Sequence, residues 1–207
     1  TFNSPLDFDK IATIISHDVN LTVGLLKMVN NVASSTRVEI TSLKQAAAYL
    51  RKPNGPRVAV FEVNGFDTHA AQGGVNGTHT KCLVEMDDII KNLKAELKDA
   101  YKDTLIVTVT EFGRTIKQNG GNGTEHGYGT AIFMAGGLIK KSQVHTDWPG
   151  LKRKELFDGR DLNATIDARS VYASAMSTVF DLDFNRIQKE VFFGDKLQNL
   201  SDKLFKA

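Results

Sequence analysis

The sequence TLIVTVTEFGRTIKQNGGNGTEHGYG, residues 104–129, carries the features that say most about the fold. Residues 105–109 form a β-branched, apolar run with the length of a buried strand. A polar, glycine-rich loop follows, with four charged or metal-capable side chains: Glu111, Arg114, Glu125 and His126. Because open α/β sheets bind ligands beyond the carboxyl ends of their strands, we predict the active-site segment here.

Composition limits the classes of protein to consider. The 207 residues are 41% hydrophobic and 24% charged, an ordinary globular mixture. Basic and acidic residues are balanced, 26 against 24, so nucleic acid is not expected as a partner. The single cysteine, Cys82, excludes an internal disulfide and a cysteine-based zinc cage. No apolar run approaches the roughly 20 residues that span a bilayer, so no membrane association is expected.

The first fifty residues have a different pattern from the rest. Apolar residues recur there at helical spacing, and we predict three helices within residues 1–50, the third capped by Thr41 or Ser42. Residues 51–57 contain the segment KPNGPR, which indicates a turn or a short linker. We therefore divide the chain into a helical segment, 1–50, a linker, 51–57, and an α/β domain, 58–207.

The predicted α/β domain alternates strands and helices. A strand over 58–63, an amphipathic helix over 81–101 and a strand over 105–109 predict a right-handed parallel βαβ unit. A third strand over 131–135 and a helix over 167–180 follow, with a short helix near the end of the chain.

Candidate metal ligands follow the first two predicted strands. Asp67 and His69 are two residues apart, so in extended backbone their side chains lie on the same side. Glu111 and His126 follow the second strand, and carboxylates with imidazoles suit zinc, manganese or iron. The alternative is structural: Asp67 accepts backbone hydrogen bonds in its loop, and Glu111 pairs with Arg114. Spacing alone does not decide between the two.

Two stretches of the helical segment, IATIISHDVNLTVGLLKMVNN (11–31) and EITSLKQAAAYL (39–50), resemble the start of an HDOD domain, a helical regulatory module. The resemblance covers about the first fifty residues. Its His17–Asp18 step invites comparison with metal-binding phosphohydrolases. One such pair offers too few ligands for a metal site, so we expect His17 in a turn and Asp18 as a helix cap.

The motifs GFDTH (65–69), TEFGRT (110–115), NGGNGTEHGYG (119–129), DWPGL (147–151) and TIDARSVYA (165–173) together resemble the DUF1501 family. That family lies near the alkaline phosphatase and sulfatase superfamily, which implies a partial parallel-sheet domain of that type behind the three helices. The resemblance implies Asp67, His69, Glu111 and His126 as ligands of a divalent metal. It also implies two residues for anion contact or support, Arg114 and Asp167.

The resemblance implies a metal-dependent hydrolase that acts on small phosphate or sulfate esters. Complete relatives carry a front strand with a Gly-Gly-x-Asp step and are often exported; because this chain has an HDOD-like segment there instead, its own activity is expected to be incomplete. A partial sheet has an exposed edge, through which we expect homo-oligomers. The alternative is a non-catalytic regulatory or binding protein, with residues 1–50 as its interaction module.

Overall fold

The computed structural model describes residues 42–206. Of the three predicted N-terminal helices, the first two lie outside these residues, as do His17 and Asp18. The third is confirmed as α3, Leu43–Leu50. It begins as predicted, because the Ser42 side chain accepts a hydrogen bond from the backbone N–H of Gln45 at 3.2 Å.

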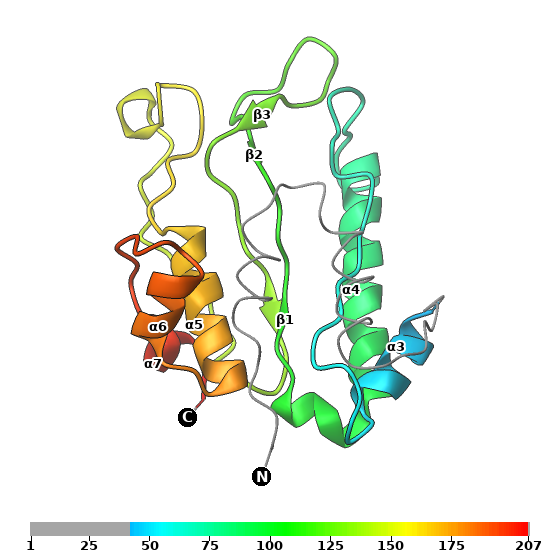
Figure 1. Ribbon diagram of the computed structural model, residues 1–207. Helices are drawn as coiled ribbons and strands as arrows, with labels where there is room; N and C mark the ends of the chain where they lie inside the picture. Colours follow the sequence, from blue (N-terminus) through cyan, green and yellow to red (C-terminus); the bar gives the residue numbers. More distant parts are fainter. Residues whose placement is uncertain (1–41, 207) are drawn as a thin grey trace.

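The described chain is a mixture of helices and short strands (Figure 1). In chain order the elements are α3, α4 (Thr78–Leu97), η2 (Lys98–Asp103), β1 (Ile106–Val107), β2 (Gly113–Arg114), β3 (His126–Gly127), β4 (Met134–Ala135), η3 (Arg153–Glu155), α5 (Ala168–Phe180), α6 (Phe184–Glu190) and α7 (Ser201–Leu204).

A long hairpin runs through the middle of the molecule. At its base β1 pairs with β4 in antiparallel register, with Ile106 opposite Ala135. Near its tip β2 pairs with β3, also antiparallel, with Arg114 opposite His126. Residues far apart in sequence therefore lie side by side in the two arms of the hairpin. Figure 1 shows the two arms running together from β1 to β3.

The mixed α/β class is confirmed, but the prediction of a parallel βαβ unit is wrong for these strands. The predicted strands 105–109 and 131–135 are shortened to β1 and β4, which pair antiparallel because the chain returns directly through the hairpin. Residues 58–63 form no strand. Their Phe61 packs against the core between α3 and α4 instead, so its burial does not depend on a sheet.

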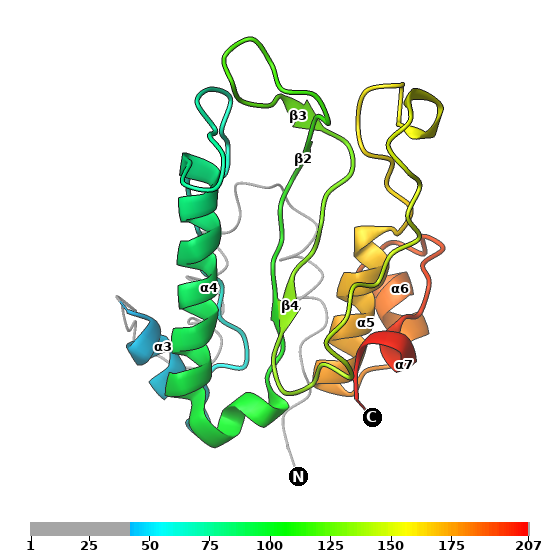
Figure 2. The same ribbon diagram turned by 180° about the vertical axis from the view of Figure 1, so that it is seen from behind.

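Helices flank the hairpin on both sides (Figures 1 and 2). Successive residues of a strand face opposite sides, and Ile106 packs against the cluster of α3 and α4 that contains Leu97. Val107 packs against the cluster of α5 and α7 that contains Val171 and Phe205. The two residues of β1 thus connect the hairpin to both groups of helices.

Within residues 42–206, the predicted helices agree with observed ones. The helix predicted over 81–101 is α4, continued by η2, and the helix predicted over 167–180 is α5. The short helix near the end is α7, and α6 precedes it. Within residues 42–206, no helix is both long enough and apolar enough to cross a bilayer.

The packing of α3 against α4 bears on how the chain is divided. Ala47 of α3 is fully buried in one cluster with Leu93 and Leu97 of α4. The predicted linker, 51–57, therefore lies between two helices that share a core. The division of the chain at this linker stays a prediction.

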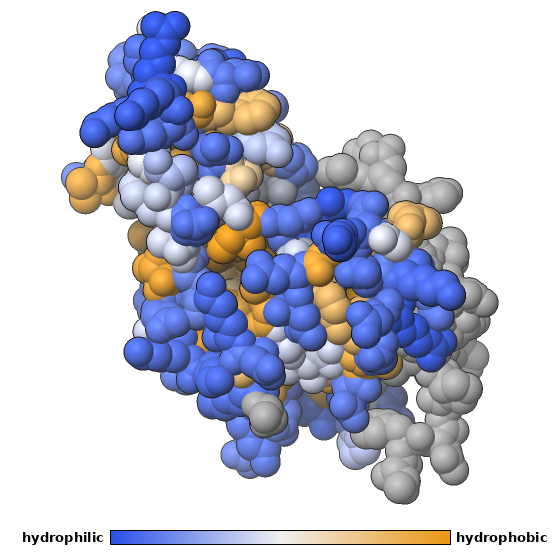
Figure 3. Space-filling model, turned by 90° about the vertical axis from the view of Figure 1, so that its left-hand side faces the viewer, coloured by the Kyte–Doolittle hydropathy of each residue, from blue (hydrophilic) through white to orange (hydrophobic). Residues whose placement is uncertain are grey.

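Several large hydrophobic side chains remain on the surface. Val109, which follows β1, is 72% exposed, and Phe133, directly before β4, is 50% exposed. Figure 3 views the molecule from the side of α5 to α7, and hydrophobic side chains also reach the surface there among hydrophilic ones. Association through a sheet edge stays a prediction.

The N-cap of α5 gives a first test. Asp167 accepts a hydrogen bond from the backbone N–H of Arg169 at 2.9 Å, so we expect Asp167→Ala to lower the free energy of unfolding by about 0.5–2 kcal/mol. Asp167→Asn keeps a good cap and loses only an exposed ion pair with Arg169, and it should stay within about 1 kcal/mol of wild type. Denaturant titration of the full chain measures both. Equal stability of Asp167→Ala and wild type would show that the cap is not used.

Candidate metal centre

Two loops pair through their backbones at the tip of the hairpin. Three backbone hydrogen bonds of 2.9–3.2 Å join residues 68–72, which precede α4, to residues 121–124, which precede β3. Ala70 and Asn122 form an antiparallel bridge between them. The pairing places the end of one loop, with Asp67 and His69, beside the start of β3, with His126.

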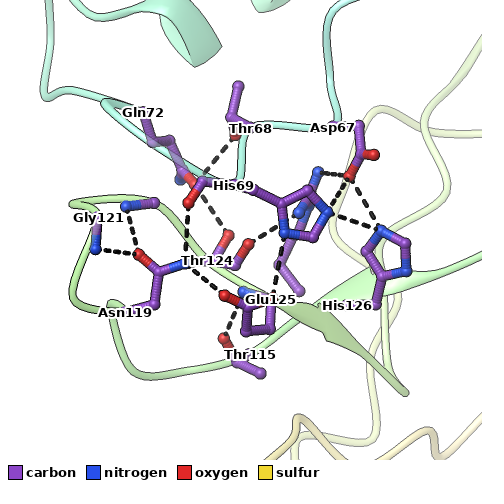
Figure 4. Close-up of polar contacts among 12 residues, drawn as sticks. Asp67, Thr68, His69, Gln72, Thr115, Asn119, Gly121, Thr124, Glu125 and His126 are labelled. Atoms are coloured by element: carbon purple, nitrogen blue, oxygen red, sulfur yellow. Dashed lines mark hydrogen bonds and ion pairs between the residues drawn. The ribbon is translucent and has the colours of Figure 1, made fainter.

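Asp67, His69 and His126 converge at this junction (Figure 4). The Oδ1 atom of Asp67 lies 3.0 Å from Nε2 of His69 and 3.0 Å from Nε2 of His126. The two Nε2 atoms are 3.1 Å apart. The three side chains are 43–55% exposed, so a small molecule can reach the cluster from solvent.

Arg114 holds Asp67 from the protein side. Its Nη2 donates to Oδ1 of Asp67 at 2.5 Å and to the carbonyl oxygen of Phe66 at 2.7 Å, and its Nη1 donates to the carbonyl oxygen of Thr124 at 2.9 Å. The Arg114 side chain is only 18% exposed. It therefore bonds to both loops at once and supplies a positive charge beside the cluster.

Glu125 and Asn119 hold His69. The Oε2 atom of Glu125 lies 3.1 Å from Nδ1 of His69, on the opposite side of the ring from the cluster. The Nδ2 atom of Asn119 donates to Oε1 of Glu125 at 2.5 Å and to the carbonyl oxygen of His69 at 2.8 Å. The imidazole of His69 thus has contacts at both nitrogens, with Glu125 at Nδ1 and with Asp67 and His126 at Nε2.

His126 is held by an aromatic contact. The ring of Phe112 stacks on the imidazole with centroids 3.7 Å apart and planes inclined by 14°. The backbone carbonyl oxygen of His126 accepts a hydrogen bond from Nη2 of Arg160 at 3.1 Å. Stacking restricts rotation of the ring and keeps Nε2 directed at Asp67.

The two carboxylates have lowered pKa values. Partial desolvation raises the pKa of Asp67, but hydrogen bonds from His126 and Arg114 and the charges of His69 and Arg114 outweigh it. The hydrogen bond from Asn119 is the largest influence on Glu125; together with the contact from His69 it outweighs desolvation and lowers the pKa. Both groups are therefore ionised at neutral pH.

The structure brings together some of the residues predicted for the site but not others. Asp67, His69 and His126 meet, and Arg114 supports them. Glu111 is exposed in the bend before β2, and it is not in the group of close potential ligands found within the described residues. Asp167 caps α5 and pairs with Arg169, and it makes no contact with the cluster.

The position of the cluster differs from the prediction because residues 58–63 form no strand and the strands of residues 42–206 pair antiparallel. The predicted site lay at the carboxyl ends of two parallel strands, over 58–63 and 105–109. The observed site lies farther along the chain, where a loop pairs with the tip of a hairpin. Asp67, His69 and His126 still meet because backbone hydrogen bonds between the loops, rather than a parallel sheet, hold their segments together.

Hydroxyl groups near the cluster already have partners. Thr68 and Thr124 both donate to Oε1 of Gln72, at 3.1 and 2.8 Å. Thr110 donates to the carbonyl oxygen of Phe112 at 3.2 Å. These hydroxyls serve the packing of the loops.

The sequence placed Glu125 among the charged or metal-capable side chains of the segment but indicated no supporting role for it, and it indicated no role for Asn119. Their spacing, six residues apart in a glycine-rich segment, predicts a turn but not a side-chain contact across it. A carboxylate directly before a candidate histidine ligand was the one available signal. His69, the hydrogen-bond partner of Glu125, lies 56 residues away in the sequence, and no local pattern reveals a contact over that separation.

Residues 32–189, about three quarters of the chain, match a family described as a protein of unknown function, DUF1501. Residues 2–50 match the HDOD domain. The family match begins at residue 32 and so includes α3. No curated protein and no solved structure matches the chain.

The close approach of the two loops gives a second test. A Cβ atom on Gly123 would lie 2.2 Å from the backbone carbonyl carbon of His69, and backbone atoms at this distance have to move. We expect Gly123→Ala to cost about 1–3 kcal/mol of unfolding free energy. The amide hydrogens that join the loops, among them that of Thr124, should also exchange faster. Gly120→Ala is the control, because a Cβ there meets nothing within 4 Å. Equal behaviour of the two variants would contradict the loop pairing.

Proposed function

The chain belongs to the DUF1501 family, and we propose that it binds one divalent metal ion through Asp67, His69 and His126 and uses it to hydrolyse phosphate or sulfate esters. The hydrolytic part of the proposal rests on the resemblance of the motifs to the DUF1501 family, which lies near the alkaline phosphatase and sulfatase superfamily. The metal-binding part rests on the geometry of the cluster.

The mutual spacing of the three ligand atoms is the observation that carries the proposal. They lie 3.0–3.1 Å from one another. Tetrahedral ligands at metal bonds of about 2.0–2.1 Å are separated by roughly 3.3 Å. A carboxylate oxygen and two imidazole nitrogens share too few protons to satisfy one another fully by hydrogen bonds. A cation at their centre would satisfy all three.

Three protein ligands are typical of a catalytic metal site. Structural zinc sites are closed by four protein ligands, whereas catalytic sites keep a position open. Within the described residues the group contains two histidines and one carboxylate, a set found with zinc and with iron; manganese also accepts it. All three side chains are exposed, which leaves the open position accessible to a substrate.

The residues around the cluster would divide the remaining tasks. A bound divalent metal supplies Lewis acidity for an ester oxygen and lowers the pKa of water. Arg114 keeps Asp67 in place and offsets its charge, which favours an anionic substrate nearby. Phe112 keeps the His126 ring in its orientation. Because the threonine hydroxyls are engaged in the loops, water is the better nucleophile.

Metal content tests the first part. We expect the wild-type chain to bind about one equivalent of zinc or manganese after dialysis, and His69→Ala and His126→Ala to bind at least about 10–100-fold more weakly. His145→Ala is the matched control, because His145 contacts Gln143 and lies outside the cluster. Inductively coupled plasma mass spectrometry and titration calorimetry measure the binding. Undiminished binding by both cluster variants would reject this site.

Ester hydrolysis tests the second part. Metal-loaded wild type should hydrolyse p-nitrophenyl phosphate or p-nitrophenyl sulfate, at the low rate that the expectation of incomplete activity implies, and His126→Ala should lose that activity while His145→Ala retains it. Metal binding by wild type without hydrolysis of either ester would retain the site and reject the reaction.

A further inference from the structure

The side-chain amide of Asn119 has a fixed orientation. Its Oδ1 accepts from the backbone N–H groups of Gly121 and Gly123, at 2.9 and 3.0 Å. An amide oxygen that accepts two N–H groups has to present its NH₂ group on the other side. Figure 4 shows this NH₂ group directed at His69 and Glu125. The loop backbone therefore decides which way the amide points.

The orientation of Asn119 determines what Glu125 can do. The Nδ2 atom donates to Oε1 of Glu125 at 2.5 Å, so this oxygen is an acceptor. An ionised carboxylate carries no proton, so Oε2 is an acceptor as well. It lies 3.1 Å from Nδ1 of His69. Nδ1 therefore carries a proton and donates a hydrogen bond to Oε2 of Glu125.

In the neutral imidazole, which has one N–H group, a proton on Nδ1 leaves Nε2 with the lone pair that a metal ligand needs. That Nε2 atom is 3.0 Å from Oδ1 of Asp67 and 3.1 Å from Nε2 of His126. A carboxylate that accepts from the outer nitrogen of a histidine fixes the tautomer and the ring orientation of a metal ligand.

We propose that Glu125, held by Asn119, is a positioning residue that keeps His69 in the Nδ1–H tautomer and presents Nε2 to the metal. This inference rests on the proposed metal site. It assigns Glu125 to the support of a ligand rather than to the metal itself, although Glu125 is the immediate neighbour of His126.

Glutamine cannot replace glutamate in this arrangement. Its side chain has one acceptor oxygen, but Asn119 and His69 both donate toward it. Whichever way the glutamine amide turns, its NH₂ group faces another donor. The substitution Glu125→Gln keeps the size of the side chain and removes the second acceptor, which makes it a sharp test.

The test combines the tautomer of His69 with zinc affinity. In metal-free protein labelled with ¹⁵N-histidine, long-range ¹H–¹⁵N correlation spectra should show a proton on Nδ1 of His69 in wild type. Glu125→Gln should shift His69 toward the Nε2–H tautomer and weaken zinc binding about 10–100-fold. Glu85→Gln, the same chemical change on the exposed surface of α4, should alter neither.

The outcomes separate the two proposals. An unchanged tautomer and unchanged zinc affinity in Glu125→Gln would overturn the role of Glu125 while the metal site stands. A weaker affinity with an unchanged tautomer would also overturn it, because loss of charge alone would then explain the effect. No zinc binding by wild type would overturn the metal site, and with it the ligand role of His69, whatever the tautomer.

Discussion

The backbone pairing between residues 68–72 and residues 121–124 is the constraint on which the site depends. Asp67 and His69 belong to a loop before α4, and His126 belongs to the central hairpin, so nothing local in the chain brings them together. Three hydrogen bonds and the close approach of Gly123 to the His69 backbone fix the distance between the loops. Side chains complete the junction once the backbones have met.

The side chains of the junction act as cross-links between the loops. Arg114 bonds to Phe66 and Asp67 on one side and to Thr124 on the other. Asn119 bonds to His69 and to Glu125. Exposed polar contacts stabilise a fold only modestly, so the hydrophobic clusters on both sides of β1 have to hold the hairpin in place. The core thus supplies stability, and the polar network supplies geometry.

Local patterns in the sequence predicted α3, α4, α5 and α7 and most of the cluster, but not α6. Ser42, which caps α3, and the apolar stripe of α4 are local signals, and the structure confirms both. Asp67 and His69 were found because they are two residues apart in extended backbone. Strand pairing is not local. Residues 58–63 have the composition of a strand, but their Phe61 packs against helices. The strands predicted over 105–109 and 131–135 form the two arms of a hairpin. Glu111 was expected at a sheet edge that does not form, and Glu125 depends on a contact 56 residues away.

The central claim is that Asp67, His69 and His126 are brought together to hold one metal ion. X-ray absorption spectroscopy at the zinc edge of the zinc-loaded full chain tests it directly. The account predicts two imidazole ligands and at least one oxygen ligand at about 2.0–2.1 Å, with the outer-shell scattering that imidazole rings produce. A first shell made of oxygen alone, without imidazole scattering, would contradict it.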